Sequence, residues 1–492
     1  MNGALNNQSM PSQDNQDAHA VPGSHDASPV LDLAADIVGS LPFTPNSQQL
    51  KAAVALARFI APGRGDLASA PSEDRVFILN GYAGTGKTSL VGAMVKVLTR
   101  RKTPLMLLAP TGRAAKVFAA NAAHPAFTVH RKIYRHNLSG STSFNAAVPQ
   151  ENKLRDAIFI VDEASMIGSE TETGSNLLTD LIHFVYSAPG CRLILMGDTA
   201  QLPPVGQTES PAMTPDVLRA YGLKVTRVTL TDVARQAAGS GILRNATRLR
   251  RALAMSPDAL PAVPPLTAER HGDVRAVEPD ELPDLIDSLY RADTPDDTIL
   301  ITWSNLSAVR FNTAIRAAVL EHEEELCVGD LLIAAKNNYH WTRSVKGLDF
   351  IANGEILRVT AIAGTERCFG LRFADVTLEP AERPGLEFQA KIILDSLTDP
   401  AAALCSDTTA LLRRSIADDP AQMRQSPYWN ALQVKYAYAV TCHKAQGGQW
   451  KNVIVDLSYV PPEQQAHDFY RWLYTAITRA RSNLYLLNLP EN

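Results

Sequence analysis

The sequence predicts an α/β fold with two parallel β-sheets and a small β-barrel inserted in the second half. In the first half, continuous runs of Val, Ile and Leu alternate with helical stretches, a pattern typical of a parallel sheet covered on both faces. These runs are 75–79, 104–110, 157–163 and 192–198. The pattern returns late in the chain, at 298–303, 452–457 and 483–489. Two α/β domains are therefore expected.

Composition limits the classes of function. The 492 residues are 45% hydrophobic and 20% charged, which is ordinary for about three globular domains. Lys and Arg number 47 against 51 Asp and Glu, a net charge of -4, so any nucleic-acid site must be a local groove. No apolar stretch approaches the roughly 20 residues that span a bilayer. The five cysteines form no C-x-x-C pair, which favours a cytoplasmic protein without a zinc or dithiol site.

Changes in composition and strand pattern along the chain set the expected domain boundaries. The first residues are polar and lack the basic and apolar regions of a signal peptide. Short alternating strands separated by Gly, Asn and Pro turns indicate the barrel. The expected parts are a disordered tail at 1–40, a first α/β domain at 41–230 with a hairpin at 135–156, a second α/β domain at 231–326 and 431–492, and the barrel at 327–430.

The strongest local signal is G-Y-A-G-T-G-K-T, residues 81–88, between a predicted strand and a predicted helix. This spacing in this context indicates a P-loop. Its glycines let backbone N–H groups surround phosphates, while Lys87 reaches the β- and γ-phosphates and Thr88 can ligate magnesium. ATP and Mg²⁺ are therefore the expected cofactors. The nucleotide-binding residues expected here are Gly81, Gly84, Thr85, Gly86, Lys87, Thr88 and Ser89.

An acidic pair ends the predicted strand at 157–163. Asp162 is expected to hold magnesium together with Thr88, and Glu163 to orient or deprotonate the attacking water. The alternative is an acidic helix cap without a catalytic part.

Two further motifs are open to more than one interpretation. Residues 46–49, Asn-Ser-Gln-Gln, form a helix capping box, and the Gln49 amide is equally suited to reading adenine. The segment 197–206, GDTAQLPPVG, ends a strand with an acid, a glutamine and a rigid Pro-Pro turn, a suitable place to sense a γ-phosphate.

Fast hydrolysis usually requires an arginine that neutralises charge in the transition state. Arg235 and Arg479 are the candidates, although a surface role is the alternative for each.

In their order along the chain, these motifs resemble those of superfamily 1 helicases, specifically the RecD and Dda-like branch. The resemblance extends from Phe43 to Leu487. The matching segments are NSQQLKAAV, GYAGTGKT, LLAPTGRAAK, FTVHRKIY, FIVDEAS, GDTAQLPPVG, LTDVARQ, AYAVTCHKAQGGQW and WLYTAITRARSNLYLL.

The resemblance implies two RecA-like P-loop domains with ATP between them, a β-hairpin insertion in the first and an SH3-like β-barrel insertion in the second. It implies that Gln49 contacts adenine and that Gln201 senses the γ-phosphate. Arg235 and Arg479 would reach the γ-phosphate from the second domain, and Gly447 and Gln449 would lie near the nucleotide.

The resemblance also implies that single-stranded DNA crosses both domains. Thr441 and His443 would face it from the second domain. Candidates on the first domain follow predicted strand ends, where ligands of α/β folds gather; helix caps or solvated charges are the alternative. They are Pro110, Thr111, Arg113, His130 and Arg131.

The expected function is an ATP-dependent DNA helicase or translocase, moving 5′ to 3′ by resemblance. Its expected partners are single-stranded DNA, tailed duplex DNA, and repair or recombination proteins. It is expected to act as a monomeric motor in repair, recombination or replication. The alternatives are an RNA helicase of the same superfamily and a DNA-stimulated ATPase subunit that separates strands only with a partner.

Overall fold

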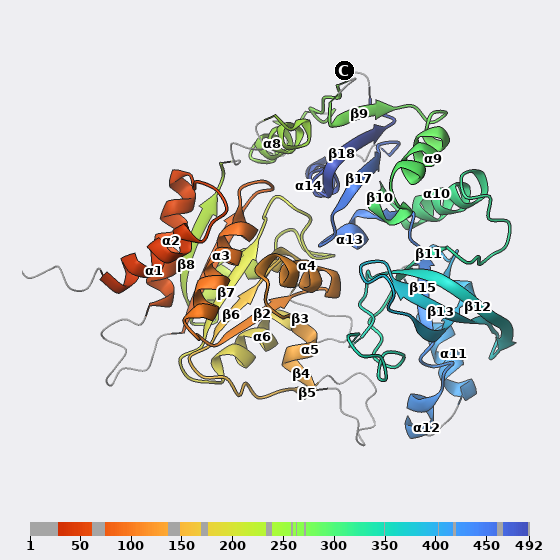
Figure 1. Ribbon diagram of the computed structural model, residues 1–492, viewed down its shortest axis with the longest axis horizontal. Coiled ribbons are helices and arrows are strands. Elements are labelled where there is room, and N and C mark those ends of the chain that lie inside the picture. The colour runs from red at the N-terminus through yellow and green to blue at the C-terminus, as the bar shows by residue number, and fades with distance from the viewer. Residues whose placement is uncertain are drawn as a thin grey trace, which may run out of the picture.

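A computed structural model gives the chain two α/β lobes and a β-barrel beside the second lobe (Figure 1). The expected fold class is confirmed. In the described part of the chain, no helix combines the length and apolar character needed to span a membrane. The described residues are 28–61, 74–135, 148–168, 176–232, 239–256, 259–261, 263–269, 272–348, 350–401, 403–416, 420–459 and 466–490.

The first lobe is a six-stranded parallel sheet in the order β3-β2-β6-β7-β1-β8. Successive strand residues point to opposite faces, so Phe77 enters one core and Ile78 the other. The strands are β1 (Arg75–Gly81), β2 (Leu105–Ala109), β3 (Ala126–Thr128), β6 (Ile158–Val161), β7 (Arg192–Gly197) and β8 (Lys224–Leu230). One face carries α1 (Ser28–Gly39), α2 (Ser47–Ile60), α3 (Lys87–Arg100) and α4 (Gly112–Ala122). The other carries α5 (Val129–Ile133), α6 (Leu177–Tyr186) and α7 (Pro215–Ala220).

Helix α1 corrects the expectation that residues 1–40 are all a disordered tail. It packs against α2 and α3. Leu33 and Ile37 are buried in the first-lobe core. These apolar side chains, one turn apart, give an otherwise polar N-terminal region a face that the core can bury. Residues 1–27 lie outside the described part.

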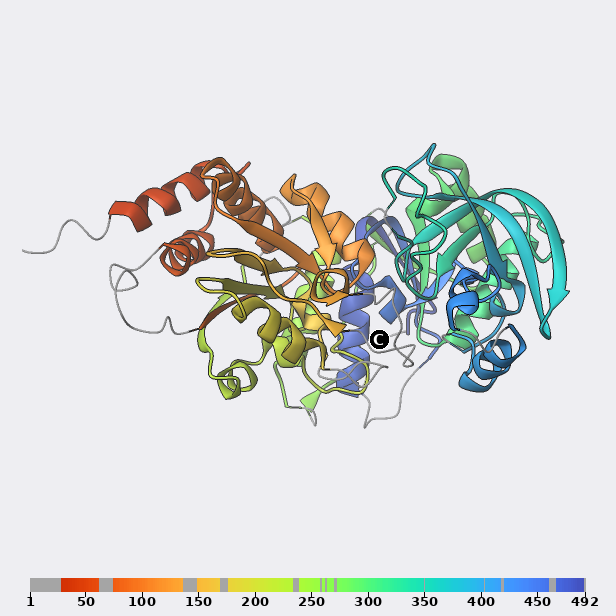
Figure 2. The same cartoon turned by 90° about the horizontal axis from the view of Figure 1, so that it is seen from below.

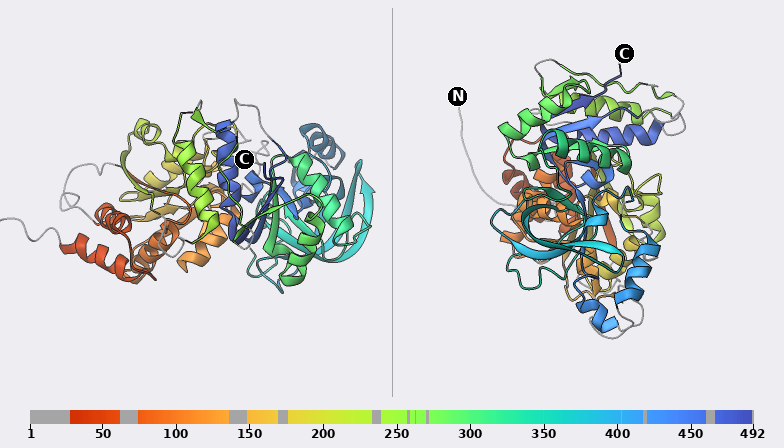
Figure 3. Two further views of the ribbon diagram at one scale, coloured as in Figure 1. Left: turned by 90° about the horizontal axis from the view of Figure 1, so that it is seen from above. Right: turned by 90° about the vertical axis from the view of Figure 1, so that its right-hand side faces the viewer.

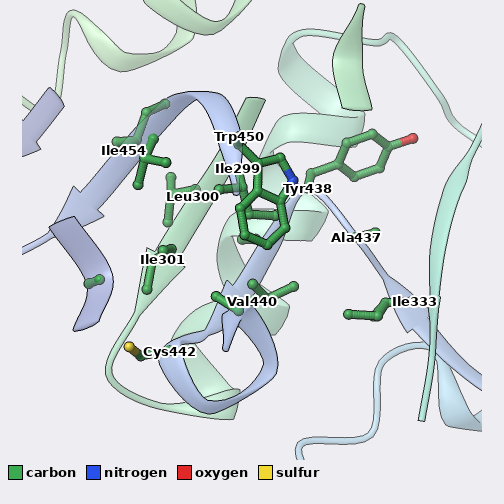
Figure 4. Packing of buried hydrophobic residues seen from close by; sticks show 14 of the residues in the cluster. Ile299, Leu300, Ile301, Ile333, Ala437, Tyr438, Val440, Cys442, Trp450 and Ile454 are labelled. Atoms are coloured by element: carbon green, nitrogen blue, oxygen red, sulfur yellow. The ribbon is translucent and has the colours of Figure 1, made fainter. Parts of the chain in front are cut away.

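The second lobe is a five-stranded parallel sheet in the order β16-β10-β17-β18-β9. Figure 4 shows Leu300 and Val440, from neighbouring strands, beside the Trp450 ring in its core. The strands are β9 (Val274–Val277), β10 (Thr298–Thr302), β16 (Ala439–Thr441), β17 (Trp450–Asp456) and β18 (Ala480–Leu487). The helices are α8 (Gly241–Leu253), α9 (Leu282–Ala292), α10 (Asn305–Ala318), α13 (Cys442–Ala445) and α14 (Ala466–Ile477).

The insertion is a closed five-stranded barrel. Its last strand corrects the expected boundary at residue 430, because β15 pairs antiparallel with β11 and closes the barrel. The single short run Leu432–Tyr436 serves the barrel before the chain returns to the second sheet at β16. The strands are β11 (Leu331–Ala334), β12 (Ile356–Cys368), β13 (Leu371–Pro380), β14 (Phe388–Ile393) and β15 (Leu432–Tyr436), and two helices, α11 (Ser406–Ile416) and α12 (Pro420–Gln425), follow β14.

The hairpin expected at 135–156 begins as an antiparallel pair, β4 (Tyr134–Arg135) with β5 (Val148–Pro149). Residues 136–147, between the two strands, lie outside the described part.

Helix α14 occupies the junction of the two lobes. It stands between the first lobe and the rest of the molecule in two perpendicular views (Figures 1 and 2), and the view from above agrees (Figure 3, left). The helix packs against α8 on one side and the second sheet on another. Its side chains are therefore placed to contact both lobes.

Candidate active site

The P-loop joins the end of β1 to the start of α3, as predicted. Gly84 and Gly86 have φ values of 74° and 82°, a left-handed conformation that side chains disfavour. A Cβ at Gly86 would also approach the Gln49 Nε2 to 2.6 Å. Lys87, the first residue of α3, donates a hydrogen bond to the Gly81 carbonyl. Sequence spacing and backbone geometry therefore agree on a phosphate-binding loop.

A cavity of about 550 Å³ lies over this loop and is lined by both lobes. The first-lobe residues lining it are Tyr82, Ala83, Gly84, Gly86, Lys87, Thr88, Ser89, Val117, Asn121, Asp162, Glu163, Gly197, Asp198 and Gln201. The second-lobe residues are Ser240, Ile242, Leu243, Gly447, Gln449, Thr478, Arg479, Ala480 and Arg481. The size and polar lining suit a nucleotide, and neither lobe alone forms the cavity.

The acidic pair lies directly after β6. Desolvation of the Asp162 carboxyl and the adjacent Glu163 carboxylate raise the pKa of Asp162 to about 7. A hydrogen bond from the Glu163 N–H and the charge of Lys87 lower this pKa, but by less. Glu163 has a φ of 50°, which turns the chain sharply at this point. A half-buried carboxylate held beside a second acid and a P-loop is an oxygen donor suited to Mg²⁺.

Replacing Asp162 with asparagine is expected to stabilise the ligand-free protein more at pH 8 than at pH 5. The raised pKa means that the folded protein holds a proton that the unfolded chain has lost between about pH 4 and 7, so the free energy of unfolding falls through that window. The melting temperature should rise by about 2–4 °C for each kcal/mol relieved. Thermal unfolding at both pH values measures the difference. The exposed Asp280→Asn is the control, and equal shifts at both pH values would contradict the prediction.

A chain of hydrogen bonds joins the lobes beside the cavity. Tyr474, on α14, donates to the Asp198 carboxylate over 2.7 Å and accepts from the Ala83 N–H of the P-loop over 3.0 Å. Burial and the Asp198 charge raise the pKa of Tyr474 far above its usual value, so the phenol stays protonated. The next residue, Thr475, accepts from the Leu202 N–H over 2.8 Å. The P-loop and the 197–206 segment are thus fastened to the same helix.

The remaining predicted nucleotide residues occupy different environments. Gln201 and Arg479 line the cavity and are 8% and 4% exposed. The Arg479 guanidinium donates to the carbonyls of Thr475 and Gly448, at 3.0 and 3.3 Å. Arg235 lies outside the described residues.

Gln49 takes the capping role that the sequence allowed. Its side chain accepts from the Asn46 N–H and donates to the Thr85 carbonyl, both over 2.9 Å. The Asn46 side chain accepts from the Gln49 N–H, which completes the capping box. Gln49 is 2% exposed and supports the P-loop from behind, so its amide does not border the cavity.

The first-lobe candidates for DNA contact lie after β2 and β3. Thr111 follows Pro110 and caps α4 by accepting from the Ala114 N–H over 3.2 Å. The Arg113 guanidinium stacks on the Trp450 ring, 3.9 Å from its centroid, and its side chain is 11% exposed. Arg113 is therefore enclosed between the lobes, an arrangement that its sequence context did not indicate.

The remaining candidates for DNA contact belong to the two lobes: His130 and Arg131 to the first, Thr441 and His443 to the second. His130 packs against Tyr134, with ring centroids 5.8 Å apart, and Arg131 lies over the rings of Phe127 and Phe350. Thr441 ends β16, and His443 is exposed on α13.

At Gly447, the second lobe lies directly against the DNA-contact candidates of the first lobe. A Cβ there would approach the Thr111 hydroxyl to 3.3 Å and the Ala114 Cβ to 3.0 Å. The loop after α13 thus packs directly on the start of α4, which places the strand ends of the two lobes together.

Sequence reasoning missed the residues whose roles depend on the docked lobes. Tyr474 is five residues before Arg479 in LYTAITRA, and only this proximity could have marked it. Arg250 of α8 stacks on the Tyr82 ring of the P-loop at 4.3 Å. The barrel also reaches the first lobe, because Lys116 pairs with Glu355 and Gly112 lies against Ala352.

Comparison with known proteins agrees with this arrangement. Residues 67–262 match the AAA domain family, and residues 436–487 match the UvrD-like helicase C-terminal domain family. The ATP-dependent RecD2 DNA helicase of Deinococcus radiodurans is 33% identical over 178 residues. In parts of both lobes the chain thus resembles superfamily 1 helicases. The predicted resemblance to the RecD-like branch is thereby confirmed.

The curated relatives of this chain are matched over only part of their length. The RecD2 match covers 35% of this chain and 21% of that protein. An uncharacterized protein of Methanocaldococcus jannaschii is 32% identical over 145 residues, which are 27% of this chain and 12% of that protein. A Pif1 helicase from Bacteroides, solved with ADP-AlF3 and single-stranded DNA, aligns over 91% of this chain and 94% of its own at 17% identity and a TM-score of 0.47. Such a loose alignment assigns no residue role.

Proposed function

We propose that this protein is an ATP-dependent DNA helicase or translocase that moves 5′ to 3′ on single-stranded DNA. One observation carries the proposal: the cavity over the P-loop is completed by the second lobe. An ATPase site built in two halves changes its activity when the lobes move, and the movement is available to displace a bound strand.

Within this proposal, the P-loop amides and Lys87 bind the phosphates of ATP. Thr88 and Asp162 would hold magnesium, which when bound neutralises charge on the β- and γ-phosphates. Glu163 orients the attacking water and accepts its proton, while Arg479 stabilises negative charge that develops on the transferred phosphoryl group. Gln201, which belongs to the 197–206 segment and lines this cavity, senses the γ-phosphate. Arg235 is assigned the same role as Arg479 from the family motif alone.

Closure of the lobes would link hydrolysis to DNA. Opening the cavity separates Tyr474 from Ala83 and lifts Gly447 from the start of α4, so both strand-binding edges move with the nucleotide state. Each lobe would hold a single strand by phosphate contacts and stacked bases. The proposed contacts are Pro110, Thr111, His130 and Arg131 on the first lobe, Thr441 and His443 on the second, and Arg113 once the lobes separate.

The proposal is tested with two duplexes that carry a 5′ or a 3′ single-stranded tail. We expect strand separation only from the 5′ tail, in the presence of ATP and magnesium, and its loss in Lys87→Ala. A lysine missing from the P-loop removes the charge that binds the β- and γ-phosphates. Gel or fluorescence assays report the separated strands, and Lys96→Ala, on the same helix, is the control.

Other results would select different functions. Unwinding from the 3′ tail alone would reverse the direction. Faster ATP hydrolysis with RNA than with DNA would favour an RNA helicase. DNA-stimulated hydrolysis without unwinding of either duplex would favour a translocase or a subunit that needs a partner, such as a repair or recombination protein. Sedimentation of the active complex on DNA would test the expected monomeric state.

A further inference from the structure

A second polar cavity, of about 240 Å³, adjoins the nucleotide cavity. Asp198 and Gln201 line both, so these two side chains form a shared wall. The second cavity continues away from the P-loop, between the 197–206 segment, the strand β8 and the helix α14. Its other lining residues are Ser165, Thr199, Pro203, Glu209, Ser210, Met213, Thr214, Pro215, Arg227 and Arg471.

Two buried polar atoms in this lining have no hydrogen-bond partner. They are the Ser165 hydroxyl and the Gln201 side-chain carbonyl, in residues that are 1% and 8% exposed. A buried polar group without a partner costs free energy, and such groups usually bond to water or a bound ligand. The lining therefore requires a polar occupant, at least for part of the catalytic cycle.

The charged side chains that line the second cavity favour the passage of a small anion through it. Arg227 and Arg471 contribute two positive charges. Of the two acids, Asp198 already accepts hydrogen bonds from Tyr474 and the Ala200 N–H. Glu209 interacts with Arg471. Two arginines opposed by partly satisfied acids attract a small anion without holding it tightly.

We propose that this second cavity receives inorganic phosphate after ATP hydrolysis and forms its exit route. The proposal rests on the proposed ATPase function and adds a route for one product. Phosphate formed beside Asp162 and Glu163 meets Gln201 on one side and the P-loop, still holding ADP, on the other. Movement of the Gln201 side chain opens the shared wall, and Ser165 and the two arginines then replace the water ligands of the departing anion.

The test separates ATP cleavage from phosphate release in a single turnover. The full-length protein, saturated with an oligodeoxythymidine strand, is mixed with ATP and magnesium. Acid quenching measures cleavage, and a fluorescent phosphate-binding protein measures release. The test variant is Arg227→Gln with Arg471→Gln. The matched control is Arg219→Gln with Arg291→Gln, which removes one exposed charge from each lobe at positions outside the lining of the second cavity.

We expect cleavage within about twofold of the unmodified protein and phosphate release about tenfold slower, because charges lining a cleft change the transit of an ion by about that factor or more. The control should match the unmodified protein in both steps. Release as fast as in the control would refute the exit route, and the cavity would then hold water alone. Absence of cleavage in the unmodified protein would instead refute the ATPase function itself.

Arg471 also donates a hydrogen bond to the Thr208 carbonyl, so its replacement can disturb the local fold. Arg227 is exposed on β8, and Arg227→Glu alone inverts a charge at the cavity without touching that contact. Slower release in this single variant, with normal cleavage and an unchanged melting temperature, supports the route. Unchanged release in it counts against the route in the same way.

Discussion

Replacing Arg479 with alanine is expected to lower kcat for DNA-stimulated ATP hydrolysis by about 10³-fold, the lower end of the contribution of an arginine that contacts the transferred phosphoryl group. Arg479 is 4% exposed and lines the nucleotide cavity from the second lobe. Its guanidinium is held by the Thr475 and Gly448 carbonyls, which leaves it preorganised for charge that develops during hydrolysis. ATP affinity should change much less than kcat, because the P-loop makes most ground-state contacts.

Steady-state hydrolysis and binding of a fluorescent ATP analogue measure these two quantities. Arg479→Lys tests whether charge alone suffices; it should also be impaired, because lysine lacks the planar set of donors that two carbonyls and a phosphate engage together. Arg251→Ala, at an exposed position on α8, is the control for loss of one positive charge. A kcat within about threefold of the unmodified protein would exclude the transition-state role, because that role is worth far more.

The sequence predicted the strands that are buried on both faces. Continuous apolar runs located β1, β2, β6, β7, β10, β17 and β18. The edge strand β8 was missed because three of its first four residues, Lys224, Thr226 and Arg227, are polar and exposed, so that no continuous apolar run forms. The last barrel strand, Leu432–Tyr436, was missed for a different reason: its partner, β11, lies about a hundred residues earlier, and pairing at such a distance leaves no local pattern.

Residues of the candidate site that local sequence positions were predictable, and residues that docking of the lobes positions were not. P-loop and acidic-pair residues are contiguous in sequence, because a strand end and a helix start place them, and the spacing alone located Lys87 and Asp162. Gln49 had two interpretations that depend on the same amide: its bonds to Asn46 and to the Thr85 carbonyl show the structural one, and the adenine contact stays a prediction. Arg113 and Tyr474 acquire their partners when the lobes dock, so no property of their own segments indicates those partners.

Replacing Tyr474 with phenylalanine is expected to lower kcat/KM for DNA-stimulated ATP hydrolysis by about 10- to 100-fold. The change removes one oxygen and leaves both the Asp198 carboxylate and the Ala83 N–H short of a partner when the lobes close. A buried polar group without a partner costs about 1–3 kcal/mol, and a 1.4 kcal/mol cost reduces the closed population about tenfold. The fall in kcat/KM should be larger with DNA than without it, because in the proposed mechanism DNA stimulates hydrolysis by closing the lobes.

Tyr470→Phe provides a matched control on the same helix. As a residue it is equally buried, and its hydroxyl donates to the Pro261 carbonyl, within the second lobe. Both variants lose one phenolic hydroxyl that makes two hydrogen bonds, so a purely structural effect should lower their melting temperatures similarly and leave the ratio of DNA-stimulated to basal hydrolysis unchanged. A selective fall of that ratio in Tyr474→Phe would identify Tyr474 as a positioning residue that transmits lobe closure to the P-loop. Equal ratios in the two variants would restrict it to packing.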